Sequence, residues 1–167
     1  MKRIPFTKKE TNTYIEERKV APCFICEIVE GKPLRDKHRI LYEDEQVIVF
    51  FSIYPTHYGH TLVCPKKHSE RVVNDLAENE YLYLQKIVHK IGKAVEKVTH
   101  PERLYIASFG SQQMNAHVHF HIVPLPKGVP ILQQQMAAMM SELVGIVDLE
   151  KSEWESLAKK IMDEIEI

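Results

Sequence analysis

The chain has 167 residues, 44% of them hydrophobic, which is enough apolar material for one domain with a buried core. Its formal net charge of −1 argues against a partner recognised through bulk charge, so we expect no contact with bulk nucleic acid. The sequence opens on no basic-then-apolar leader and contains no apolar run near the roughly 18 residues of a membrane span, so we expect no membrane attachment. Three cysteines in such a chain suit the reducing cytoplasm, which is the expected location.

The first half of the chain predicts an extension followed by a β-hairpin. Residues 1–20 are polar and rich in Lys, Glu and Thr, and we expect an N-terminal extension that is either solvated or docked on the domain. The central domain is expected over residues 21–127. Within it, residues 40–42 and 46–52 predict a hairpin across residues 43–45, and residues 61–64 predict the next strand, which ends at a proline.

A long helix is predicted after these strands. Apolar residues recur at helical spacing from Leu84 to Val98, and the following His100-Pro101 pair ends the pattern. Asp75 and Glu78 predict a capping box at its start. An apolar stripe of this kind faces a core.

Two more strands are predicted at residues 104–108 and 116–123, around a short loop. Strands therefore dominate the expected core, and the long helix covers one face. This order predicts an α+β fold, an antiparallel β-sheet with a long helix on one face.

A C-terminal helical extension packed on the domain is expected over residues 128–167. The methionine-rich stretch 131–147 predicts a helix against the domain or a subunit partner. Ser152 and Glu155 predict the cap of a final amphipathic helix.

Three histidines, His117, His119 and His121, alternate along the last predicted strand. Alternate residues of a strand face the same way, so the three imidazoles are expected to share one face. Imidazole is both a common metal ligand and a proton carrier near neutral pH. Two functions stay open on this pattern: the three histidines hold a catalytic zinc ion, or one imidazole is a nucleophile that its neighbours orient.

Cys23 and Cys26 form a Cys-Phe-Ile-Cys pair, and this spacing suits two thiolates on one zinc ion. Two tetrahedral positions then remain for histidines. Four further histidines stand singly in polar or helical surroundings and are expected at the surface: His38, His57, His89 and His100. His68 and one histidine of the triplet are the best pair to complete the site.

Two segments carry a resemblance to a known family. Residues 59–68, Gly-His-Thr-Leu-Val-Cys-Pro-Lys-Lys-His, and residues 116–124, Ala-His-Val-His-Phe-His-Ile-Val-Pro, follow the cysteine pair. Together they resemble the histidine triad (HIT) family of nucleotide-binding proteins over roughly residues 20–126. The resemblance implies a HIT-like fold, and its zinc-containing branch implies that Cys23, Cys26, His68 and His117 hold the metal. A site with four protein ligands has no open position, so this zinc would be structural.

The family's nucleophile is the middle histidine of the triplet, so the resemblance implies that His119 attacks phosphorus. A covalent His119-nucleotide intermediate splits one displacement into two easier ones. His121 can donate to the phosphate oxygens or steady the nucleophile.

The resemblance also implies a nucleotide pocket. Its apolar positions around the base are Phe24, Ile25, Ile28, Phe50 and Ile53. Gln113 matches a phosphate-contacting glutamine and is placed with the catalytic residues, while Gly110 and Ser111 offer backbone N–H groups to the phosphate. Ser52 stands where the family has an Asp or Asn that binds the ribose.

Two further departures bear on the substrate. Leu125 stands in place of an Arg, and Met114 in place of a Ser or Thr that helps to protonate the leaving group. A thioether cannot deliver a proton, whereas a polyphosphate leaving group is already a stable anion. His121, where the sugar-phosphate transferase branch has Gln, favours water or phosphate as the second acceptor.

The sequence thus predicts a nucleotidyl hydrolase or transferase that cleaves dinucleoside polyphosphates or related nucleotide anhydrides at the α-phosphate through His119, with a structural zinc. The first alternative is a zinc-containing nucleotide-binding or interaction module with little turnover. The second is a metal-dependent hydrolase in which the three histidines hold a catalytic zinc. A nucleotide is the expected partner, and the resemblance allows a homodimer.

Overall fold

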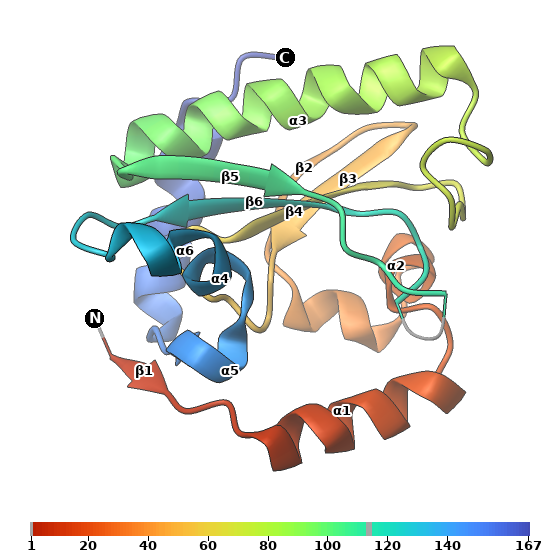
Figure 1. Cartoon of the computed structure of the whole chain (residues 1–167). Helices are drawn as coiled ribbons and strands as arrows, with labels where there is room; N and C mark the ends of the chain where they lie inside the picture. The colour runs from red at the N-terminus through yellow and green to blue at the C-terminus, as the bar shows by residue number, and fades with distance from the viewer. Residues whose placement is uncertain (1, 113–114) are drawn as a thin grey trace.

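The computed structural model describes residues 2–112 and 115–167, and its centre is a five-stranded antiparallel sheet in the order β2-β3-β4-β6-β5 (Figure 1). Its strands are β2 (Ile40–Glu43), β3 (Val47–Phe51), β4 (Thr61–Pro65), β5 (Arg103–Ala107) and β6 (Phe120–Leu125). The Asp44 carboxylate closes the β2–β3 turn by accepting the N–H groups of Gln46 and Val47 at 2.8 and 2.7 Å. The expected α+β fold with an antiparallel sheet is confirmed.

Helix α3 (Glu78–Thr99) covers one face of this sheet, as the helical spacing predicts (Figure 1). Its apolar stripe packs on β4 and β6, and α6 (Lys151–Asp163) packs beside it and against β2. Leu157 and Ile161 of α6 are fully buried in the same core as Leu84 and Ile91 of α3. The C-terminal helix therefore completes the core on this side of the sheet.

Both predicted helix caps are wrong. The Glu80 carboxylate accepts the Ala77 N–H at 2.8 Å and opens α3, whereas Asp75 accepts the N–H groups of Glu70 and Arg71 in the preceding loop. The N-cap of helix α6 is Glu150, two residues before the expected cap, and its N–H donates to the Glu153 carboxylate at 2.8 Å. In each case the carboxylate of a Glu three residues after the N-cap accepts the N-cap N–H. This is one of the two hydrogen bonds of a capping box, formed at other residues than those predicted.

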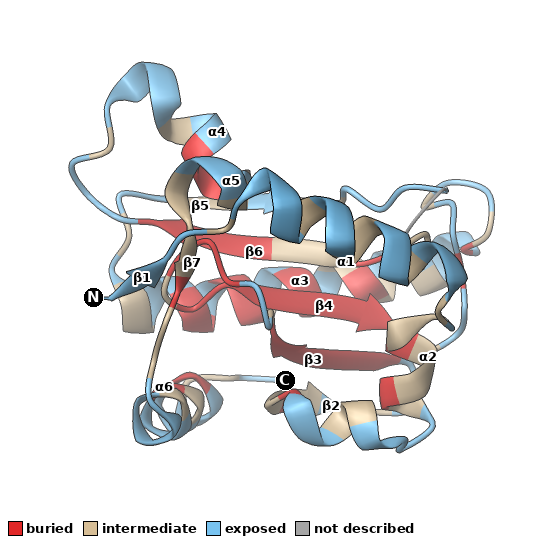
Figure 2. Cartoon of the chain, turned by 90° about the horizontal axis from the view of Figure 1, so that it is seen from below, coloured by how far each residue is buried: buried red, intermediate tan, exposed pale blue. Residues whose placement is uncertain are grey.

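The other face of the sheet is covered by short elements and by the N-terminal helix α1 (Lys8–Val20), which lies on the side opposite α3 (Figures 1 and 2). These elements include α2 (Phe24–Val29), the 3-10 helix η1 (Pro33–Lys37), η2 (Ile131–Gln133), α4 (Gln134–Met139) and α5 (Ser141–Val144). Strand β1 (Arg3–Ile4) pairs with β7 (Ile146–Val147), which ties the N-terminal segment to the C-terminal one. The N-terminal segment is docked, although α1 buries none of its side chains.

Strand β6 begins at Phe120 and runs to Leu125, so the expectation of a strand over residues 116–123 is wrong for its first four residues. The Val118 N–H donates to the Ser69 carbonyl at 2.6 Å instead of joining the sheet. His117 and His119 therefore lie in the loop before β6, and the three histidines do not share one strand face. Among the described residues, no helix is both long and apolar enough to cross a membrane.

Candidate functional site

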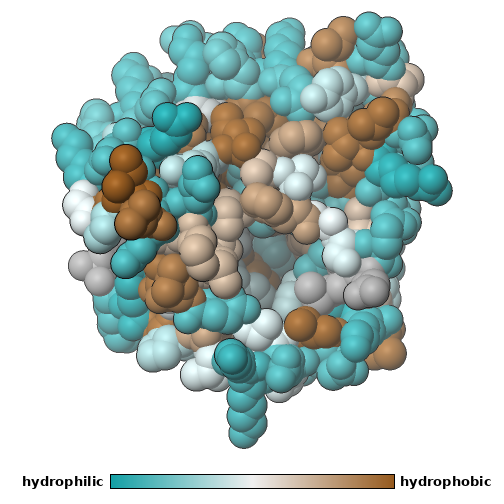
Figure 3. Space-filling view, in the orientation of Figure 1, coloured by the Kyte–Doolittle hydropathy of each residue, from teal (hydrophilic) through white to brown (hydrophobic). Residues whose placement is uncertain are grey.

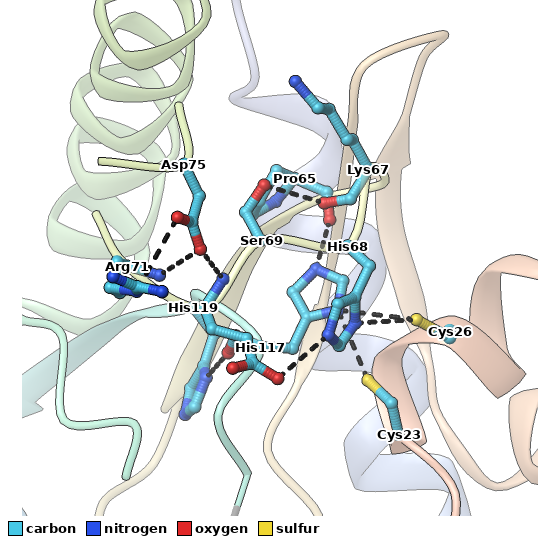
Figure 4. A network of polar contacts seen from close by, with 11 residues as sticks. Cys23, Cys26, Pro65, Lys67, His68, Ser69, Arg71, Asp75, His117 and His119 are labelled. Atoms are coloured by element: carbon cyan, nitrogen blue, oxygen red, sulfur yellow. Dashed lines mark hydrogen bonds and ion pairs between the residues drawn. The ribbon is translucent and has the colours of Figure 1, made fainter. Parts of the chain in front are cut away.

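The four expected metal ligands meet at one place, although they come from three separate segments (Figure 4). Cys23 and Cys26 flank the start of α2, His68 follows β4, and His117 precedes β6. Their ligand atoms all lie within 4.8 Å of one another. The Nδ1 atom of His117 is 3.3 Å from Cys23 Sγ and 3.6 Å from Cys26 Sγ, and Cys26 Sγ is 3.2 Å from His68 Nδ1.

The rings of both histidines in this cluster are held in one orientation by a contact of their second nitrogen. His117 Nε2 donates to the Pro65 carbonyl at 2.9 Å, which leaves the lone pair on Nδ1 facing the sulfurs. His68 Nε2 lies 3.2 Å from the Glu70 carboxylate, so its Nδ1 faces Cys26 in the same way. Partners of this kind typically orient histidine ligands of zinc.

The donor set fits a zinc ion. Zn–S bonds of about 2.3 Å and Zn–N bonds of about 2.0 Å place tetrahedral sulfur and nitrogen ligands about 3.5 Å apart, close to the separations found here. Burial lowers the pKa of His117 to about 4, so this imidazole is neutral and able to bind metal at pH 7. Burial and Cys23 raise the pKa of the Cys26 thiol to about 12, and a divalent cation would displace its proton. This cluster could therefore hold zinc.

A second group of three histidines, His60, His119 and His121, lies beside the metal cluster. The rings of His119 and His121 are 4.9 Å apart between centroids, and those of His60 and His121 are 5.2 Å apart. Backbone and side-chain contacts fix the proton positions of all three rings. This group is the candidate reaction centre.

His119 has a single tautomer that suits a nucleophile. Its Nδ1 lies 2.7 Å from the His117 carbonyl oxygen, which can only accept, so Nδ1 carries the proton and Nε2 carries the lone pair. Burial lowers the pKa of His119 below its usual range, which keeps the ring neutral at pH 7. The ring also contacts Phe24 edge-on, with 6.1 Å between centroids.

His121 is oriented as a hydrogen-bond donor by His60. The Thr56 N–H donates to His60 Nδ1 at 3.2 Å, so His60 carries its proton on Nε2 and donates it to His121 Nδ1 at 2.9 Å. His121 then carries its own proton on Nε2. Burial lowers the pKa of His121 to about 2 and that of His60 to about 3, so this chain is uncharged at pH 7.

A cavity of about 530 Å³ opens onto these rings, between the sheet and α1, and the surface is hollowed near the centre of Figure 3. Of the predicted nucleotide residues, five line it: Phe24, Ser52, Ile53, His119 and His121. Its opposite wall is formed in part by α1, whose Tyr14 hydroxyl accepts a hydrogen bond from Asn115 at 2.8 Å. The cavity is large enough for a nucleotide.

The other predicted pocket residues lie elsewhere. Ile25, Ile28 and Phe50 are fully buried in the core cluster between α2 and the sheet and do not line the cavity. Gly110 lies directly against the centre, since a Cβ atom there would lie 3.6 Å from His119 Cε1. The exposed Ser111 follows it in the same loop, and Gln113 and Met114 lie outside the described residues.

Sequence reasoning missed His60, and it was wrong to place His38 and His57 at the surface. His38 is 7% exposed and His57 2% exposed, and His57 is bonded to the Ala137 carbonyl at 2.8 Å and to Arg3 at 3.0 Å. His89 and His100 are exposed as expected. The sequence around the buried His57 does not distinguish it from the exposed His89 and His100, because the residues that bond to His57 lie far away in the chain.

Replacing His60 by Phe is expected to lower kcat about 10- to 100-fold, because His121 loses the donor that fixes its ring and its proton. Nucleotide affinity should change only a few-fold. Steady-state kinetics separate the two effects. A variant with unchanged kcat would show that His60 does not position His121.

Stability is expected to fall as the pH drops below about 6.5, the ordinary pKa of histidine. The fold holds His60 neutral down to about pH 3, so between these values the unfolded chain binds the extra proton. In this range His60 lowers the free energy of unfolding by up to ~1.4 kcal/mol for each pH unit that the pH falls. Urea unfolding from pH 7 to pH 5 measures it. His60→Asn should show a shallower slope, and equal slopes would contradict the assignment.

Comparison with known proteins agrees with this geometry. The HIT domain family model matches residues 35–128. An uncharacterized HIT-like protein of Methanocaldococcus jannaschii is 36% identical over 109 residues, covering 64% of this chain and 81% of that protein. The adenosine 5′-monophosphoramidase of Schizosaccharomyces pombe is 33% identical over 107 residues, covering 62% of this chain and 74% of that enzyme.

The fold is also similar to that of a solved zinc-bound histidine triad protein. This protein of Mycobacterium smegmatis matches with a TM-score of 0.65 and 25% sequence identity, over 84% of this chain and 93% of that one. The matched domain holds β2 to β6, and with them His60, His68 and the histidine triplet. Since the family model spans more than half of the sequence, the chain belongs to the HIT family.

Proposed function

We propose that the protein is a nucleotidyl hydrolase or transferase that forms a covalent intermediate on His119. The observation that carries this proposal is the fixed tautomer of His119, whose Nδ1 proton is held by the His117 carbonyl at 2.7 Å while the ring lines the cavity. His121, with its proton on Nε2, stands beside it as the donor to a phosphate oxygen. A nucleophile and an adjacent donor are what phosphoryl-group transfer requires of side chains.

The reaction takes two displacements. His119 Nε2 attacks the α-phosphorus, a P–N bond forms, and the P–O bond to the departing phosphate chain breaks. Water then attacks the same phosphorus, a P–O bond forms, the P–N bond breaks and His119 recovers its lone pair. The proton of the attacking water passes to solvent, and the product is a nucleoside monophosphate.

We propose a structural role for zinc at Cys23, Cys26, His68 and His117. When bound, the ion would cross-link the start of α2 to the loop after β4 and the loop before β6, and its four protein ligands would leave no position for substrate. His117 links the two sites, since its ring belongs to the metal cluster and its carbonyl accepts the His119 proton. The cluster would thereby hold the backbone that orients the nucleophile.

The proposed substrates are dinucleoside polyphosphates or related nucleotide anhydrides. The support is Met114, which cannot protonate an amine leaving group. The Schizosaccharomyces pombe relative bears the name of an adenosine 5′-monophosphoramidase, so a phosphoramidate is the competing substrate to assay. Side-by-side assays should give a higher kcat/KM for diadenosine tetraphosphate than for adenosine 5′-phosphoramidate, and a much faster turnover of the phosphoramidate would contradict the preference. Met114→Ser should shift the ratio toward the phosphoramidate.

A binding module with little turnover is the second candidate. One observation favours it: the Ser52 hydroxyl already accepts the Tyr54 N–H at 3.2 Å, which reduces what it offers to a ribose. Calorimetric binding of a nucleotide without turnover of either substrate would establish this alternative.

We further propose a homodimer in the cytoplasm. The support for the location is the set of free cysteines, of which Cys23 and Cys26 must stay reduced to bind metal. For the dimer it is β5, an edge strand of the sheet whose Ile106 is 45% exposed, followed by Phe109 at 58%. Light scattering of the purified protein should give twice the 19.5 kDa mass of one chain, and the mass of a single chain would contradict the dimer.

A further inference from the structure

A buried histidine that the proposed reaction does not use lines the same cavity. His38 follows η1 and is 7% exposed, and it lines the cavity together with Leu34, Leu62 and Phe24. Its ring stands edge-on against Phe50, with 5.0 Å between centroids and an interplanar angle of 80°. The side chain is therefore held firmly in an apolar surrounding.

The tautomer of His38 is set by the backbone. Nδ1 lies 2.8 Å from the Leu34 carbonyl oxygen, and since that oxygen can only accept, Nδ1 carries the proton. Burial, and to a lesser degree Lys37, lowers the pKa of His38, so the ring stays neutral. Nε2 is consequently a hydrogen-bond acceptor.

This acceptor has no hydrogen-bond partner among residues 2–112 and 115–167. Within that part of the chain, Gln85 Nε2 is the fully buried side-chain nitrogen or oxygen that lacks a partner. The unbonded Nε2 of His38 is therefore not sealed inside the protein and is reached from the cavity that the ring lines. Nε2 is therefore available to accept a hydrogen bond from a ligand bound in the cavity.

The sheet register gives the direction of that ligand. Ile40, Phe50, Leu62 and His121 are paired one with the next across β2, β3, β4 and β6, so they form one row on the face of the sheet that α2 covers, and Leu62 and His121 of this row line the cavity. His38 precedes the β2 end of the row, and His121 lies at the other end. The two ends are three strand spacings apart, about 14 Å. A nucleotide whose phosphate lies at His121 can therefore extend its base along this row to His38.

We propose that His38 Nε2 accepts a hydrogen bond from the exocyclic amino group of an adenine base and so determines the base specificity of the site. The inference rests on the proposed nucleotide site and adds the identity of its base. Hypoxanthine carries a keto oxygen where adenine carries the amino group, and two acceptors facing each other repel. Unsubstituted purine offers neither group and leaves Nε2 unpaired.

Calorimetric titration of the zinc-loaded protein with three nucleotides tests the proposal. AMP should bind about tenfold more tightly than purine riboside 5′-monophosphate, the loss expected for one hydrogen bond in an excluded site. IMP should bind more weakly still. Equal affinity for AMP and the purine nucleotide, or tighter binding of IMP, would overturn the proposal without the use of any variant.

The variant His38→Phe keeps a ring against Phe50 and removes both nitrogens. It should bind the three nucleotides with affinities within about twofold of one another. The matched control is His57→Phe, a buried histidine whose two nitrogens are already bonded to the protein and which does not line the cavity. It should keep the preference for AMP. Retention of the full preference in His38→Phe would refute the assignment.

Binding is measured without turnover, so the two proposals fail separately. Preference for AMP in a protein that cleaves neither substrate would refute the catalytic proposal and leave the role of His38 standing. Turnover without a preference for AMP would refute the role of His38 and leave the catalytic proposal standing.

Discussion

Replacing His119 by glycine is expected to abolish turnover, with kcat falling by about 10⁴-fold or more, because the atom that forms the P–N bond is removed. Asparagine should have the same effect, since the lone pair of its amide nitrogen is delocalised into the carbonyl and does not attack phosphorus. Nucleotide affinity should stay within a few-fold of wild type, because most of the cavity wall is unchanged. Steady-state kinetics and calorimetry on the same preparation measure both quantities.

The matched control is His100→Gly, which removes an exposed histidine that ends α3 with a left-handed backbone that glycine adopts freely. It should keep full activity. Turnover at the wild-type rate in His119→Gly would mean that a different group attacks phosphorus, and the proposed reaction would have to be abandoned.

Replacing Cys23 by serine is expected to remove the zinc and to lower the melting temperature by roughly 10 °C, the shift of a few kcal/mol in a domain of this size. The cross-link between α2 and the loop of His117 would be lost, so activity should fall with the metal. Elemental analysis and thermal unfolding on the same samples measure the two effects.

Cys64→Ser supplies the contrast for that experiment. Cys64 is fully buried in the core cluster beside α2 but is not among the four grouped ligands, so its loss should cost stability while the zinc content stays at one ion per chain. Survival of both zinc and activity in Cys23→Ser would contradict the structural four-ligand site.

Much of the architecture could be predicted from local patterns. The hairpin of β2 and β3, the strand β4 and the stripe of α3 follow from alternation and helical spacing, which depend on near neighbours in the chain. The cysteine spacing and the resemblance also led to the four grouped metal ligands. Each of these features is determined by residues that are close to one another in the sequence.

The loop before β6 could not be predicted in this way. Alternation suggested that His117, Val118 and His119 continue the strand, but the Val118 N–H is bonded to Ser69, which lies in a distant loop. This departure from the sheet is what turns His117 toward the cysteines and brings its carbonyl to His119. A shared strand face would have placed the three rings in one site, whereas the structure divides them between two.

The tautomers that decide the chemistry were equally out of reach. They depend on acceptors and donors supplied by remote backbone, such as the Leu34 carbonyl for His38 and the Thr56 N–H for His60. Single histidines in polar sequence are usually exposed, so His38 carried no local sign of its role, and the motif that contains His60 did not indicate its bond to His121. Only the assembled sheet brings His60 to His121.

Intact-protein mass spectrometry after rapid acid-free quenching with diadenosine tetraphosphate tests the central claim most directly. We expect a mass increase of one nucleoside monophosphate residue in the wild-type protein, mapped to His119 by peptide analysis and absent from His119→Gly. An adduct on another residue, or turnover by the wild type with no adduct at any quench time, would contradict a His119-nucleotide intermediate.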